Sequence, residues 1–175
     1  MRIAYTILLM LAISTSLLSQ TDFTKQLEGI IKDSTNHFRN FKSGFKETRF
    51  TESIPDSIFY TNISVDGTTN NELLISKSEY IFMADVADSL NEINGRKVVD
   101  EWRDKIYTVL GSGFTIEEVK KVEWNPSKYG WDFTKGNVTV NINLFPHEKN
   151  STINWIGLAV SVFADEDEVV AKKDN

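Results

Sequence analysis

Two segments near the C-terminus constrain the fold most, because each alternates apolar and other residues over the length of a strand. In residues 138–144 (VTVNINL) every second residue is apolar. In residues 155–163 (WIGLAVSVF) the apolar row alternates with Trp155 and three small residues. Successive side chains of a strand point to opposite faces, so both segments predict half-buried strands with one apolar face. The short connection at residues 146–154 predicts a hairpin.

Further strand signals are weaker. Residues 58–65 and 73 to about 86 predict a second hairpin, with a turn at Asp66 and Gly67. The second of these strands is interrupted by the polar triplet 76–78, where we expect a bend or bulge. Residues 119–124 and 131–133 predict one more strand, or two that are broken between them. Residues 41–57 mix aromatic and polar residues with Pro55, which predicts a loop packed down by its aromatics.

Two amphipathic helices are expected. The first covers about residues 22–40, where apolar residues recur at spacings of three, four and seven. The second runs from about Arg96 to Leu110, with Trp102 on its apolar stripe. Residues 87–93 predict a short helical turn before it, ended by Asn94 and Gly95.

These elements predict an α+β fold, with a mainly antiparallel sheet of about five strands and two amphipathic helices packed on one face. The other face is left to water or to a partner. We expect one domain at residues 21–163, followed by a flexible acidic C-terminal tail at residues 164–175.

The N-terminal residues predict export. Arg2 precedes an uncharged, mostly apolar run, which is typical of a secretory signal peptide at residues 1–19 with cleavage after Ser16 or Ser19. The absence of cysteine removes thiol chemistry and lipid attachment through a thiol. The sequence therefore predicts a periplasmic or extracellular protein with no stable membrane anchor after cleavage.

Charge argues against polyanionic partners. The net charge of −6 becomes −7 without the signal peptide, because that segment holds one base and no acid. A chain this acidic, with scattered bases, repels phosphate backbones, so we expect no nucleic acid partner.

Catalytic chemistry finds little support in the sequence. His37 and His147 lie outside any metal-ligand or triad spacing, so we assign no catalytic residue, metal or cofactor. Paired acids such as Glu117 with Glu118, or Glu123 with Asp132, arise by chance in an acidic chain and are interpreted as solvated strand edges.

Aromatic residues in the final strands and turns give the one functional lead. Trp155 shares its strand face with Gly157, Ala159 and Ser161, and small residues beside an aromatic ring leave space for a ligand. The competing interpretation is packing, with Trp155 covering a sheet edge and Trp131 filling the end of the core. The candidate ligand-binding residues are Trp155, Asn141, Asn143, Trp131, Tyr129 and Trp124.

The sequence therefore favours a non-enzymatic exported module that binds an unknown protein or small molecule. One alternative is an extracytoplasmic hydrolase that uses acidic residues. Another is an inhibitor or immunity-type protein, for which residues 45–55 would form a protruding loop.

Overall fold

A computed structural model describes residues 22–51, 54–119, 126–147 and 150–163 of the chain. The expected signal peptide, the acidic tail, Glu123 and Trp124 lie outside these described residues.

Eight strands form one antiparallel sheet in the order β1-β2-β3-β4-β8-β7-β6-β5. The α+β class is confirmed, but the expectation of about five strands is wrong. The strands are β1 (Lys42–Thr51), β2 (Ile54–Thr61), β3 (Thr69–Ile75), β4 (Glu79–Leu90), β5 (Thr115–Glu118), β6 (Tyr129–Lys135), β7 (Val138–His147) and β8 (Asn150–Phe163).

The expected loop at residues 41–57 is instead β1 and the first half of β2. Residues 42–49 are all exposed, so neither face of this edge strand selects apolar residues and no alternation appears in the sequence. The segment proposed as a protruding inhibitory loop therefore includes paired strands, with Phe45 opposite Phe59 and Phe50 opposite Pro55.

The expected single strand at residues 73–86 is part of a hairpin between β3 and β4. Its polar triplet forms the turn rather than a bulge. The Ser76 amide donates to the Glu79 carbonyl at 2.9 Å, and the Ser76 hydroxyl accepts from the Glu79 amide at 3.0 Å. Serine is favoured in turns because its side chain can bond to nearby backbone in this way.

Helix α2 (Glu92–Leu110) begins earlier than expected, and β4 extends to Leu90 where a turn of helix was predicted. The Asn91 side chain caps the helix by accepting a hydrogen bond from the Asn94 amide at 2.9 Å. Gly95, expected to end a helical turn, lies inside α2, where an added Cβ would be 2.5 Å from Leu144 Cδ1. Glycine therefore allows α2 to lie close to β7.

Residues 22–34 form the other described helix, which is shorter than the expected segment to residue 40. It stops because His37 and Phe38 adopt positive φ angles of 54° and 55°. Among the described residues, neither helix is long and apolar enough to cross a membrane.

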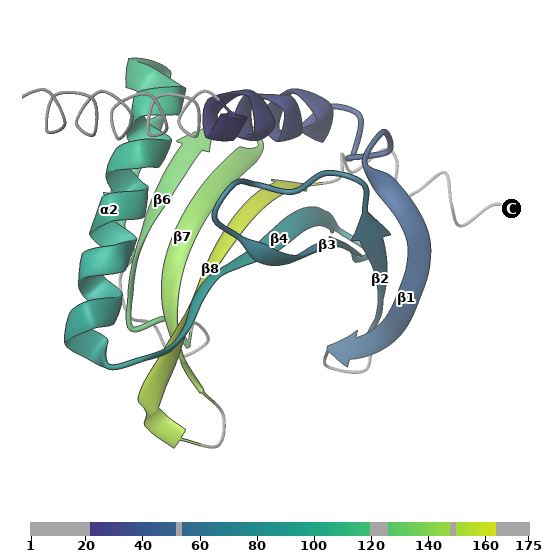
Figure 1. Cartoon of the computed structure of the whole chain (residues 1–175). Helices are drawn as coiled ribbons and strands as arrows, with labels where there is room; N and C mark the ends of the chain where they lie inside the picture. The colour runs from purple at the N-terminus through teal and green to yellow at the C-terminus, as the bar shows by residue number, and fades with distance from the viewer. Residues whose placement is uncertain (1–21, 52–53, 120–125, 148–149, 164–175) are drawn as a thin grey trace, which may run out of the picture.

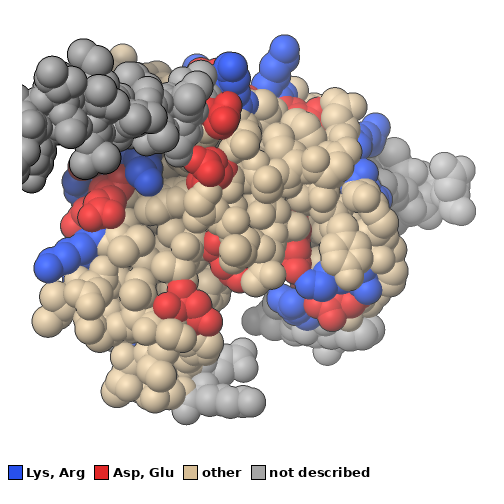
Figure 2. Space-filling model, viewed as in Figure 1, with Lys and Arg blue, Asp and Glu red and all other residues tan. Residues whose placement is uncertain are grey.

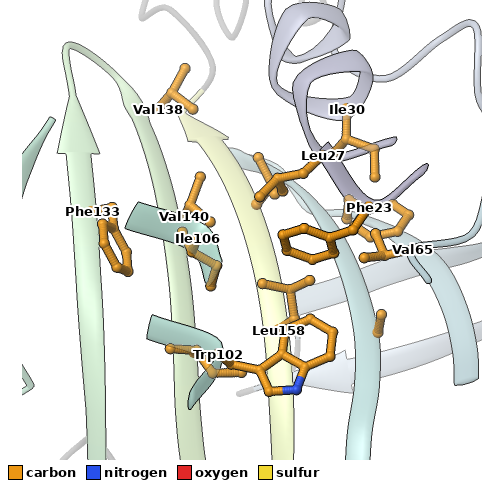
Figure 3. Packing of buried hydrophobic residues seen from close by; sticks show 14 of the residues in the cluster. Phe23, Leu27, Ile30, Val65, Trp102, Ile106, Phe133, Val138, Val140 and Leu158 are labelled. Carbon is orange, nitrogen blue, oxygen red and sulfur yellow. The ribbon is translucent and has the colours of Figure 1, made fainter. Parts of the chain in front are cut away.

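Both helices cover the same face of the sheet and share one core (Figures 1 and 3). Phe23 of the first helix meets Trp102 of α2 edge to face at 5.5 Å between ring centroids. Fully buried side chains from the helices and from both halves of the sheet complete this core, among them Leu27, Ile30, Ile106, Phe82, Phe133, Val140 and Val160.

The described residues show one arrangement, a helix followed by four strands, twice. β4 and β8 lie at the centre of the sheet, and β1 and β5 lie at its edges. The first four strands therefore have the same order from edge to centre as the last four, with β1 equivalent to β5 and β4 equivalent to β8. The sheet curves strongly, and its β1 and β2 end bends away from the plane of β6 and β7 (Figure 1).

Candidate functional site

The face opposite the helices holds a groove of about 420 Å³. Lys46 and Arg49 of β1 line this groove together with Trp155 of β8, although β1 and β8 are four strand positions apart. In a flat sheet that separation would be about 19 Å. The sheet therefore curves toward this face and makes it concave, and Figure 2 shows a hollow bordered by acidic and basic side chains.

Strand register forms the floor of the groove. Met83 of β4 lies opposite Ala159 of β8, which lies opposite Asn141 of β7, and all three line the groove. In the next row Asp85 lies opposite Gly157. The small side chain of Ala159, which is half-buried, leaves this part of the floor open.

Two stacked aromatic rings form one wall of the groove. Phe145 and Trp155 have ring centroids 4.6 Å apart and planes inclined by 26°. The indole lies over Gly157, where an added Cβ would be 2.7 Å from Trp155 Cζ3. Glycine at this position therefore makes room for the outer edge of the indole, and both rings line the groove.

Most charged side chains that line the groove have partners. Lys46 forms an ion pair with Glu72, and the hydrogen bond to Glu72 raises the pKa of Lys46. Arg49 pairs with Glu47, outside the groove lining, at 3.1 Å.

Asp85 is bound differently. Its Oδ2 accepts a hydrogen bond from the Asn70 side-chain amide at 2.7 Å. No basic side chain in the described ranges forms an ion pair with it.

A second hollow of about 240 Å³ adjoins the groove and shares Asp85 and Trp155 with it. His147 and Asp88 line this hollow and interact, with 2.6 Å between His147 Nε2 and Asp88 Oδ1. That hydrogen bond, together with one from the Ser89 amide, lowers the pKa of Asp88.

Tyr129 and Trp131 lie on the other face of the sheet, against α2. The Tyr129 hydroxyl donates to Asp100 Oδ1 at 2.7 Å, and Trp131 Nε1 donates to the same oxygen at 3.3 Å. Arg96 lies over the Tyr129 ring and Arg103 over the Trp131 ring, at 4.6 and 5.0 Å from the ring centroids. Burial raises the pKa of Tyr129. The structure does not bring these two aromatics to Trp155.

The two asparagine candidates differ in their environment. Asn141 is half-buried and lines the groove. Asn143 is buried, and its Oδ1 accepts a hydrogen bond from the buried Ser127 hydroxyl at 3.1 Å. Of the six candidates, Trp155 and Asn141 therefore meet in the groove, while Trp124 lies outside the described residues.

Asp85, Lys46 and Arg49 are groove residues that the sequence did not single out. The sequence does contain a pattern that places Asp85 on this face. Met83 and Asp85 alternate along β4 with Phe82 and Ala84, which are buried on the side of the core. Lys46 and Arg49 carry no such signal, because β1 lacks alternation.

A pair of carboxylates lies at the opposite end of the same face. Glu117 of β5 is directly opposite Asp132 of β6, and both line an open hollow of about 550 Å³. Burial, and then the negative charge of Glu117, raise the pKa of Asp132. Strand register places these groups side by side on one surface, whereas glycoside hydrolysis needs carboxylates on either side of the scissile bond.

Within the described residues, no group of three or more His, Asp or Glu side chains is arranged to hold a metal ion. Comparison of the chain with protein-family models, curated proteins and solved structures found no match.

Proposed function

We propose that this protein is a non-enzymatic binding module that holds a small amphipathic molecule in the concave groove. The main support for this proposal is the position of Trp155. Its ring contacts Gly157, stacks on Phe145 and borders the open part of the groove floor at Ala159. An apolar part of the ligand would lie against these rings, and its polar part would face Asp85 and Asn141.

The groove has the composition of a ligand site. Pockets for small molecules have volumes of about 300–1,000 Å³ and combine apolar surfaces with a few placed polar groups. The groove, at about 420 Å³, offers Phe145, Trp155 and Met83 as apolar surfaces and Asp85 and Asn141 as polar groups.

The module is proposed to act outside the cytoplasm. The basic and apolar N-terminal residues support this placement.

Ligand-observed NMR with a library of small amphipathic fragments tests the proposed function. Ala159→Phe adds a ring to the groove floor and should abolish the saturation transfer of fragments that bind the wild-type protein. Thr134→Phe is the matched control, because Thr134 is exposed on β6 and outside the groove lining. Fragment binding that survives Ala159→Phe, or the absence of any binding fragment, would contradict the proposal.

A further inference from the structure

The ion pairs along the groove and the adjoining hollow do not include every acid that lines them. Three basic side chains line them, and each is paired with an acid: Lys46 with Glu72, Arg49 with Glu47, and His147 with Asp88. Asp85 lines both hollows and accepts a hydrogen bond from the neutral side-chain amide of Asn70. Among the described acidic residues that line the groove and the adjoining hollow, Asp85 is therefore the one without an ion-pair partner.

The Asp85 carboxylate lies next to the aromatic wall. Asp85 is the register partner of Gly157, and the Trp155 ring lies over Gly157. Facing side-chain positions on paired antiparallel strands are about 4.5–5.5 Å apart, so the Asp85 carboxylate and the indole border the same space. Both Asp85 and Trp155 line both hollows, which places this space where the hollows join.

A carboxylate beside an aromatic face is a combination that recognises organic cations. The ring attracts a cation through its quadrupole, and quaternary ammonium groups are bound by aromatic rings in this way. A carboxylate adds an opposite charge, and partial exclusion of water strengthens the attraction. An anionic ligand would instead meet Asp85 without a compensating base.

We infer that the ligand of the concave groove is an organic cation of the ammonium class, with its charge between Asp85 and Trp155. This inference rests on the proposed function and specifies the chemistry of its ligand. The apolar carbon atoms around the charge would contact Trp155 and Phe145, and the floor at Ala159 would receive the rest of the molecule.

Choline and its neutral isostere 3,3-dimethyl-1-butanol test the inference, because they differ mainly in the charge. Binding is measured by titrating ¹⁵N-labelled protein and following the indole N–H signal of Trp155, assigned with Trp155→Phe. We expect choline to bind about tenfold more tightly than the isostere. Asp85→Asn keeps the size and an acceptor for Asn70 and should remove this preference.

Asp88→Asn is the matched control, because Asp88 lines the adjoining hollow but is already paired with His147. It should keep the preference for choline, and the ¹⁵N spectrum of each variant shows whether it is folded. Equal binding of both probes would overturn the inference and leave groove binding intact. A preference that persists in Asp85→Asn would also overturn it, as would the failure of choline to bind while neutral fragments bind.

Discussion

At the scale of single residues, glycines decide which side chains of the concave face are available to a ligand. Gly157 leaves room for the Trp155 ring to lie over the sheet. Gly130 has the opposite consequence, because Asn143 fills the space above it and becomes buried. Alternation in the sequence places Asn141 and Asn143 on one face. Asn143 nevertheless becomes a packing residue, because its partner on the neighbouring strand β6 is Gly130, which has no side chain.

Gly130→Ala should destabilise the protein by about 1–3 kcal/mol, the usual result of overpacking. The new Cβ would lie 1.9 Å from Asn143 Oδ1 and 2.7 Å from the Ile142 carbonyl oxygen, and a backbone atom of a central strand cannot easily move. Urea denaturation of the wild type and the variant measures the change in the free energy of unfolding.

Gly44→Ala is the control for this substitution. Gly44 is an exposed residue of β1 with nothing within 4 Å of an added Cβ. Alanine restricts the unfolded chain more than glycine does, so this variant should be as stable as the wild type or more stable by up to about 1 kcal/mol. Equal losses in both variants would contradict the steric account of Gly130.

At the scale of elements, the edge pair of β5 and β6 makes stability depend on pH. The pKa of Asp132 is raised from its ordinary value of 3.8 by burial and by the charge of Glu117. The folded state therefore holds this proton more tightly than the unfolded state does. As the pH rises from the pKa of Asp132 in the unfolded state through its pKa in the folded state, the free energy of unfolding falls. The loss of stability is complete above both pKa values, where the carboxylate is ionised in both states.

Asp132→Asn should consequently raise the urea midpoint at pH 7 and leave it nearly unchanged at pH 3, where both states of the wild type are protonated. Glu117→Gln should act in the same direction at pH 7 but less, because burial is the larger cause of the pKa shift. A larger gain at pH 3 than at pH 7 would contradict this assignment.

Elements differ in how well the sequence predicts them, and burial explains the difference. β7 and β8 are half-buried central strands, so their alternation was visible. β1 is an edge strand whose residues 42–49 are all exposed, so neither of its faces is marked by apolar residues. The sequence therefore does not distinguish it from a loop. The Ser76 turn divides one apparent strand into two through local side-chain bonds that alternation does not reveal.

The candidate site shows the same limit. The sequence placed Trp155 beside Gly157 and Ala159 because all three lie on one strand. It grouped Tyr129 and Trp131 with Trp155, whereas β6 turns these two side chains toward Asp100 of α2. The face on which a short strand presents its aromatics depends on register with its neighbour, here Trp131 opposite the buried Ile142, and register is a tertiary property.

At the scale of the whole molecule, the two helix-plus-four-strand halves share one core. Phe23 and Leu27 from the first half belong to the same buried cluster as Trp102 and Ile106 from the second. β4 and β8 join the halves through a strand pair that runs from Glu79 opposite Phe163 to Leu90 opposite Asn154. Such a core predicts that neither half keeps its structure when the other unfolds.

Leu27→Ala tests this cooperativity, because all four tryptophans lie in the second half of the chain, at positions 102, 124, 131 and 155. Leu27 is fully buried, so its truncation should lower the free energy of unfolding by about 2–5 kcal/mol. If the halves form one cooperative unit, the urea midpoint followed by tryptophan fluorescence should fall as far as the midpoint followed by far-ultraviolet circular dichroism. A fluorescence midpoint that stays at the wild-type value while the dichroism midpoint falls would show that the halves unfold separately. Since the groove is formed by β1 and β3 of one half and by β7 and β8 of the other, cooperative unfolding would also mean that ligand bound there stabilises both halves together.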